Sequence, residues 1–229
     1  MLTIGLIDDG IGVFSVYYKL KQSFAANYIC KICDTAFPFG KQKSEVLLSA
    51  GKKAVDDLAR LNCNFIVLSS VTLSTLLYKR LCACSPVPLY SCEAPVLHAS
   101  TYTASGVLVA GDSSVISRFK EPNVLPCAMD EFPLLAENAR EREIVQYIAS
   151  AVAEYEGRFD CIALANSSMN MYKRCFSRVC PNAQVFDSLE GVARRLRKKY
   201  KKNTKDECSV AVLDQDNVDI TQKYALFLE

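Results

Sequence analysis

Histidine is nearly missing from this sequence, which has His98 as its single example beside eleven cysteines. A structural zinc site takes about four cysteine or histidine ligands, and the pair Cys30 and Cys33 cannot complete one. The segment around this pair reads as a strand, on which residues three apart point to opposite faces. We therefore expect no metal, and we interpret most of the cysteines as small buried hydrophobic side chains.

Long apolar runs and a strong net charge are also missing. No run approaches the roughly 18 residues of a membrane-spanning helix, and the formal net charge is only +2. The N-terminus enters a strand-like run at once, without a basic leader or a small-residue cleavage site. These absences predict a cytoplasmic protein with reduced thiols and with neither a membrane nor a nucleic acid as partner.

Phosphate-binding fingerprints are incomplete. Gly10 and Gly12 begin a pattern typical of dinucleotide sites, but the third glycine is replaced by Ser15. No GxxxxGK[ST] segment occurs, which excludes a P-loop. The glycines therefore point to a tight turn or to another kind of ligand.

What the sequence does contain is a regular alternation of short apolar runs and helical patterns. Strand-like runs occupy residues 2–7, 28–32, 65–68, 106–110, 161–164, 184–186 and 209–213. Helical patterns occupy residues 13–23, 44–61, 74–82, 113–119, 140–155, 171–179 and 189–201. Such alternation predicts an α/β fold with mainly parallel sheets.

Small polar residues follow four of these strands, in the loops 8–12, 34–40, 69–72 and 166–168. Because ligands bind at the carboxyl ends of parallel strands, these loops form a candidate ligand site. A plainer interpretation is equally open: the glycines permit tight turns, and Ser70 and Asn166 are N-caps of the helices that follow.

Five segments, in order along nearly the whole chain, resemble the bacterial glutamate racemases of the aspartate/glutamate racemase superfamily. They are IGLIDDGIG at 4–12, CDTAFPFGKQ at 33–42, PVPLYSCEAP at 86–95, SGVLVAGDSSVIS at 105–117 and VFDSLEGVARRL at 185–196. The resemblance implies two similar lobes, each a mainly parallel sheet flanked by helices, with a ligand cleft between them. Residues 1–91 and 206–229 would form the first lobe, and residues 92–205 the second.

Members of that family racemise glutamate without a cofactor, using one cysteine on each side of the substrate. The corresponding residues here are Ser70 and Asn166. A hydroxyl titrates about five units above a thiol, a penalty of order 7 kcal/mol or roughly five powers of ten in rate. An amide can neither take nor deliver a proton at neutral pH. We therefore expect no cofactor and no working racemase. Among the cysteines, Cys92 beside Glu93 is the one to test for a rescue of activity.

The resemblance also marks a substrate site that has changed. Asp9 stands where the family has serine, and a second carboxylate there disfavours an anionic ligand. Val71, Phe39 and Ser168 replace an asparagine, a tyrosine and a histidine of the family. The ligand-binding residues that the resemblance implies are Asp8, Asp9, Pro38, Phe39, Gly40, Ser70, Val71, Thr72, Asn166, Ser167 and Ser168.

Three functions stay open. The first is a racemase-like protein without racemase activity that binds a partner or a small polar ligand, such as an amino acid or a dicarboxylate. The second is an isomerase or related enzyme that uses Asp8 or Asp9 as a base. The third is a structural or regulatory protein that binds a macromolecule through the basic stretch 194–205, which a solvated helix end also explains. The resemblance leaves assembly as a homodimer open as well.

Overall fold

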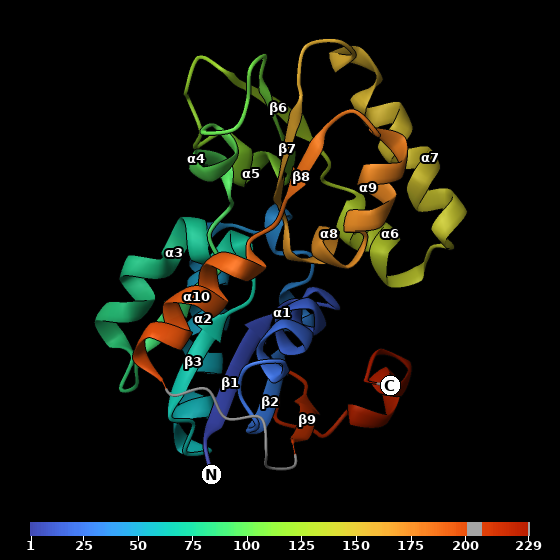
Figure 1. Cartoon of the computed structure of the whole chain (residues 1–229). Helices are drawn as coiled ribbons and strands as arrows, with labels where there is room; N and C mark the ends of the chain where they lie inside the picture. The colour runs from blue at the N-terminus through green and yellow to red at the C-terminus, as the bar shows by residue number, and fades with distance from the viewer. Residues whose placement is uncertain (201–207, 229) are drawn as a thin grey trace.

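Two parallel sheets organise the computed structural model, which describes residues 1–200 and 208–228 (Figure 1). The first sheet contains, in spatial order, β4 (Leu89–Ser91), β3 (Phe65–Leu68), β1 (Thr3–Asp8), β2 (Asn27–Ile32) and β9 (Ser209–Leu213). The second contains β6 (Val124–Ala128), β5 (Val107–Gly111), β7 (Cys161–Ala165) and β8 (Gln184–Phe186). Neighbouring strands are parallel in both sheets.

Helices flank each sheet, which confirms the predicted fold class. Those beside the first sheet are α1 (Gly12–Lys21), α2 (Ser44–Arg60), α3 (Val71–Cys84) and α10 (Leu189–Lys199), with 3-10 turns η1 (Asp34–Ala36), η2 (Phe39–Lys41) and η4 (Thr221–Phe227). Those beside the second are α4 (Val96–Ala99), α5 (Ser113–Ile116), α6 (Phe132–Asn138), α7 (Glu141–Val152), η3 (Ala153–Tyr155), α8 (Ser167–Met171) and α9 (Lys173–Val179).

Burial explains why the strands read as continuous apolar runs. Strand β3 is buried along its whole length, and so are β5 and β7, because helices cover both faces of a parallel sheet. One hydrophobic cluster continues from Val13 of α1 to Phe132 and Met169 of the second lobe. The two lobes are therefore joined by apolar packing as well as by the chain.

Two short strands, β4 and β6, and two short α-helices, α4 and α6, were not predicted, and neither were the 3-10 turns η1, η2 and η4. Strand β6 contains Pro126, which cannot donate a hydrogen bond to a neighbouring strand, and it lies at the edge of its sheet, where this is tolerated. The predicted helix 171–179 begins earlier and is divided at Tyr172 into α8 and α9.

The chain crosses between the lobes twice, after β4 and after β8, and strand β9 then returns to pair with β2. Helix α10 follows the second crossing and packs against α1, with Lys19 Nζ 2.6 Å from Glu190 Oε2. The lobe boundaries at residues 91 and 206 stay a prediction, and residue 206 lies outside the described part of the chain. None of the described helices is both long and apolar enough to span a bilayer.

Candidate functional site

The predicted site residues meet where the carboxyl ends of the two sheets face each other. Asp8 ends β1, and its Oδ1 accepts a hydrogen bond from the Ser167 hydroxyl of the second lobe at 3.0 Å. The Thr72 hydroxyl of the first lobe donates to Asp112 Oδ2, after β5, at 2.7 Å. The structure therefore brings the loops after β1, β3 and β7 together, as the topology of parallel sheets predicts.

Asp8, which is buried, and Asp9, which is partly buried, form a pair of carboxyl groups at this contact. The Asp9 amide donates to Asp8 Oδ1 at 3.0 Å, and Asp9 Oδ2 accepts from the Phe39 amide at 2.6 Å. Burial raises the pKa of Asp8 well above its usual value, and the charge of Asp9 raises it further. Burial raises the pKa of Asp9 as well. The pair thus holds a proton more tightly than exposed aspartates do.

Two residues of the predicted ligand-contacting segment Pro38 to Gly40 also pack within the fold. Phe39 is 1% exposed and belongs to a hydrophobic cluster with Leu47 and Leu68. Gly40 lies directly against Asp112: a Cβ at Gly40 would be 2.4 Å from Asp112 Cγ. A larger residue would not fit there.

Ser70 and Asn166, the residues that the resemblance aligns with the family's cysteines, both cap helices. Ser70 Oγ accepts from the Leu73 amide of α3 at 3.2 Å. Asn166 Oδ1 accepts from the amide and the hydroxyl of Ser168, at 2.9 and 2.6 Å. The plainer interpretation of these residues as N-caps is confirmed. Val71, between Ser70 and Thr72, is fully buried and packs with apolar residues of the second lobe.

Two carboxylates of the second lobe, which the sequence did not single out, complete the site. Asp112 accepts from Thr72 and also from Asn166 Nδ2, at 3.1 and 3.2 Å from its two oxygens. Glu137 Oε1 accepts from the Ile11 amide of the first lobe at 2.6 Å. Burial raises the pKa of Asp112 to about 7, while its hydrogen bond from Thr72 opposes the shift. Burial also raises the pKa of Glu137.

A signal for one of these carboxylates was present in the sequence. Asp112 stands two residues after the predicted strand 106–110, so the rule that selected the other loops applies to it equally. Glu137 lies inside the short helix α6, and no pattern in the sequence marks it.

The two lobes are in direct contact at this site, because glycine stands at three points of close approach. A Cβ at Gly10 would be 2.2 Å from Glu137 Oε1, and one at Gly12 would be 2.5 Å from Ser167 Oγ. Gly40 and Asp112 form the third such contact. The structure is therefore a closed form, in which the site's own side chains occupy the space between the predicted ligand-binding loops.

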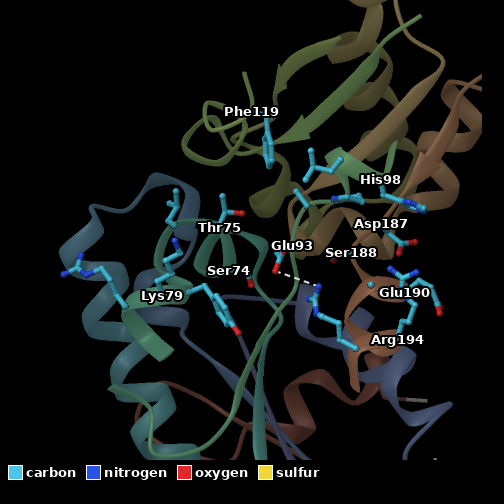
Figure 2. Close-up of a pocket in the computed structure, with 18 residues that line it drawn as sticks. Ser74, Thr75, Lys79, Glu93, His98, Phe119, Asp187, Ser188, Glu190 and Arg194 are labelled. Atoms are coloured by element: carbon cyan, nitrogen blue, oxygen red, sulfur yellow. Dashed lines mark ion pairs between the residues drawn. The ribbon is translucent and has the colours of Figure 1, made fainter. Parts of the chain in front are cut away.

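A groove of about 720 Å³ lies elsewhere, where the chain crosses between the lobes (Figure 2). Its walls come from α3, from the crossing segment and from α10, and an ion pair of 3.9 Å joins Glu93 to Arg195 across it. None of the predicted ligand-binding residues lines this groove. We therefore keep it apart from the candidate site.

Three cysteines lie in or directly after strands of the first sheet. Cys30, Cys33 and Cys92 are fully buried, and burial together with the charge of Asp8 raises the pKa of each thiol far above its usual value. Such thiols stay protonated at neutral pH and are poor bases. No described group of three or more His, Cys, Asp or Glu side chains is arranged to hold a metal ion.

Comparison with known proteins shows that the chain is similar to several glutamate racemases. No protein-family model matches the chain. The glutamate racemase of Campylobacter concisus (strain 13826) is 23% identical over 213 residues, which cover 85% of this chain and 81% of that protein. The crystal structure of glutamate racemase from Thermus thermophilus in complex with β-chloro-D-alanine has a TM-score of 0.82 at 17% identity, covering 99% of this chain and 92% of that one.

A second solved structure is similar in the same way. Escherichia coli glutamate racemase in complex with L-glutamate and the activator UDP-MurNAc-ala has a TM-score of 0.76 at 18% identity, covering 93% of this chain and 88% of that one. Together with the five matched segments, these likenesses agree along nearly the full length of the chain. The chain has the two-lobed fold of the glutamate racemases, and its resemblance to the aspartate/glutamate racemase superfamily is confirmed.

Proposed function

We propose that the chain is a glutamate racemase-like protein that does not racemise glutamate and that keeps the site between its lobes for a small polar ligand or a partner. The observation that carries this proposal is the use of Ser70 and Asn166 as helix caps. A racemase must remove a proton from one face of a carbon atom and return it on the other. A capping hydroxyl and a capping amide can do neither at neutral pH.

The class of ligand follows from the neighbours and from the polar groups that remain. The solved relatives hold an amino acid or an amino-acid analogue: L-glutamate in the E. coli protein and β-chloro-D-alanine in the T. thermophilus protein. Thr72 and Ser167 still present hydroxyl groups between the lobes here, and both already form hydrogen bonds across the site. We infer that a ligand of similar size binds when the lobes separate.

Proton exchange in heavy water tests the proposal. Purified protein incubated with L-glutamate, and separately with D-glutamate, should incorporate no deuterium at the α-carbon above the rate without protein. Exchange is read by proton nuclear magnetic resonance. The glutamate racemase of C. concisus, under identical conditions, is the positive control. Incorporation at about 1 per second or more would contradict the proposal, because a rate of that size is typical of enzymes.

A second candidate function rests on the raised pKa values of Asp8 and Asp9. A pair of neighbouring carboxyl groups with raised pKa values is suited to act as a base or acid on another small acid, amino acid or amide. If a substrate is found, Asp9→Asn should reduce its turnover by at least about 100-fold, the usual contribution of a general base. Glu143→Gln, a change on α7 away from the site, serves as the control. Equal turnover in Asp9→Asn and the original protein would remove this candidate.

The third hypothesis, a macromolecular partner at the basic stretch, has less support. Arg197 is ion-paired with Glu190, and Arg195 pairs with Glu93 at 3.9 Å and donates to the Ser91 carbonyl. These cations are engaged within the molecule, as expected of a solvated helix end. Residues 201–205 of the stretch lie outside the described part of the chain.

A further inference from the structure

Asp112 immediately precedes helix α5, a position where an aspartate usually accepts hydrogen bonds from the first helical amides. Its side chain forms no such bond. The Ser113 amide donates instead to Asp130 Oδ1 at 2.7 Å, and the Ser113 hydroxyl donates to Asp130 Oδ2 at 2.5 Å. Asp130 thus satisfies the start of α5, and the fold does not require Asp112 for that purpose.

All the side-chain hydrogen bonds of Asp112 go to predicted ligand-binding residues. Thr72 donates from the first lobe at 2.7 Å, and Asn166 donates from the second at 3.1 and 3.2 Å. Gly40 lies against the carboxyl carbon, where any Cβ would clash. The carboxylate is 1% exposed and fits into a space bounded by both lobes. Its surroundings are those of a bound carboxylate ligand.

The charge of Asp112 is not neutralised by a cation. No lysine or arginine among residues 1–200 and 208–228 forms an ion pair with it. Burial raises its pKa to about 7, the hydrogen bonds from Thr72 and Asn166 lower it, and the charge of Asp9 raises it. Burying a carboxylate in this way costs stability, so packing of the fold alone does not explain why an aspartate stands here.

We propose that Asp112 is an internal ligand of the site: its carboxylate holds the donors of Thr72 and Asn166 that would otherwise bind the carboxylate of a small ligand. The proposal rests on the proposed function, since it takes these two residues to belong to a ligand site. An external carboxylate competes with Asp112 for the same hydroxyl and amide. Asp112 therefore occupies these two donors until a ligand displaces it.

Removal of the Asp112 carboxylate should create a binding site for acetate, the smallest probe that carries a methyl group and a carboxylate. In Asp112→Ser a hydroxyl replaces the acid at a position where serine is a good N-cap, so α5 should form normally. The melting temperature of this variant should rise with sodium acetate concentration and reach a plateau, measured against sodium chloride at equal ionic strength. The melting temperature of the original protein should not change with acetate over the same range.

Matched variants make the response specific. Asp130→Ser removes the carboxylate that bonds Ser113 and vacates no donor between the lobes, so acetate should have no effect on it. Asp112→Ser/Thr72→Val lacks one of the two donors and should lose most of the acetate response of Asp112→Ser. An equal response in Asp112→Ser and Asp130→Ser, or no response in a folded Asp112→Ser, overturns the proposal.

Stability of the variants provides a second decisive measurement. Asp112→Ala should be folded like Asp112→Ser, because α5 keeps Asp130. If both variants were unfolded at room temperature, Asp112 would be a structural element and not an internal ligand. The acetate experiment is also independent of the proposed loss of racemisation, since binding of acetate involves no exchange of an α-proton. Deuterium exchange and acetate binding can therefore fail separately.

Discussion

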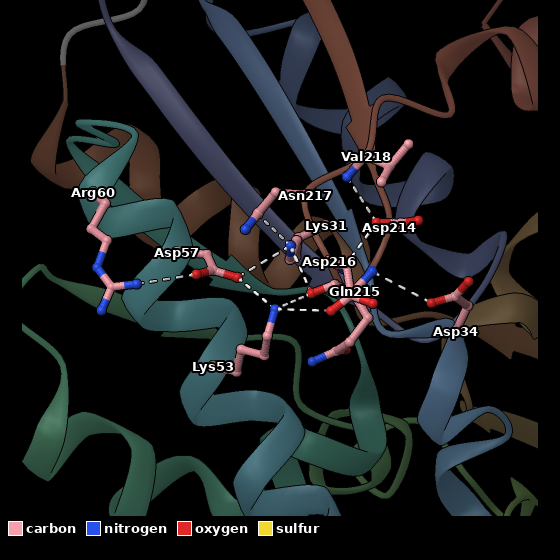
Figure 3. Close-up of polar contacts among 10 residues, drawn as sticks. All are labelled: Lys31, Asp34, Lys53, Asp57, Arg60, Asp214, Gln215, Asp216, Asn217 and Val218. Atoms are coloured by element: carbon pink, nitrogen blue, oxygen red, sulfur yellow. Dashed lines mark hydrogen bonds and ion pairs between the residues drawn. The ribbon is translucent and has the colours of Figure 1, made fainter.

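Asp57→Leu should lower the free energy of unfolding by about 3–5 kcal/mol, because it leaves the ammonium group of Lys31 buried without a counter-charge. Lys31 lies in β2 with a fully buried side chain, and its Nζ is 3.3 Å from Asp57 Oδ2 of α2 (Figure 3). Urea unfolding followed by circular dichroism measures the change.

Two further variants separate the buried charge from other effects of the substitution. Asp56→Leu changes the neighbouring acid, which forms no ion pair among the described residues, and should alter stability by no more than about 0.5 kcal/mol. Lys31→Met/Asp57→Leu removes both charges and should recover most of the loss, since an apolar pair of similar volume packs well. A double variant as unstable as Asp57→Leu would contradict this account.

Lys31 has further hydrogen bonds, so the loss of Asp57 should destabilise more than one contact. Its ammonium also donates to Asn217 Oδ1 at 2.5 Å and to the Gln215 carbonyl at 3.3 Å, in the turn after β9 (Figure 3). Lys53 of α2 reaches Asp57 at 3.2 Å from the exposed side. Burial alone would raise the pKa of Asp57, but the hydrogen bonds that its carboxylate forms with Lys53, Asn217 and Lys31 outweigh burial and lower the pKa. The cluster ties β2, α2 and the C-terminal segment together.

Gly12→Ala should destabilise the closed form by roughly 2–3 kcal/mol, the usual cost of overpacking. The added Cβ would lie 2.5 Å from Ser167 Oγ and 2.8 Å from the Ser167 carbonyl carbon. A side chain can rotate, but the backbone of α8 can move only if the lobes separate. Thermal unfolding should therefore show a lower melting temperature, and hydrogen exchange should show weaker protection of amides near Asp8 and Ser167.

Gly191→Ala provides the matched control. Gly191 lies in the first half of α10, and a Cβ there meets nothing within 4 Å. Alanine favours the helix by about 1 kcal/mol over glycine, so this variant should be slightly more stable than the original protein. If both substitutions lowered stability equally, contact between the lobes would not be the reason for glycine at residue 12.

The sequence predicted the regular core of the molecule well, for a physical reason. The bounds of β3, β8 and β9 agree with prediction, because their apolar, β-branched runs end abruptly at polar or turn-forming residues. Strand β6 was not predicted, because Pro126 is typical of a loop, although the edge strand of a sheet tolerates proline. Helix α6 is too short, at 7 residues, to show a clear apolar period.

The site was less predictable than the fold, because its contacts join residues far apart in sequence. The loops after the strands were found from topology and from the resemblance. The bond between Glu137 and Ile11 spans 126 residues, and nothing local in the helix of Glu137 indicates a partner in the other lobe. The sequence alone did not show whether Ser70 and Asn166 cap helices. The hydrogen bonds from the Leu73 amide to Ser70 and from the Ser168 amide to Asn166 show that they do.

The place of β9 beside β2 determines the order in which the two halves can be finished during protein synthesis. Every residue of the second sheet leaves the ribosome before Ser209–Leu213, the strand that completes the first. Until β9 is synthesised, the first sheet is incomplete and the backbone of β2 is unpaired along one side. The second sheet can fold before that point. A nascent chain stalled shortly before residue 208 should expose that edge to chaperones or to a second nascent chain.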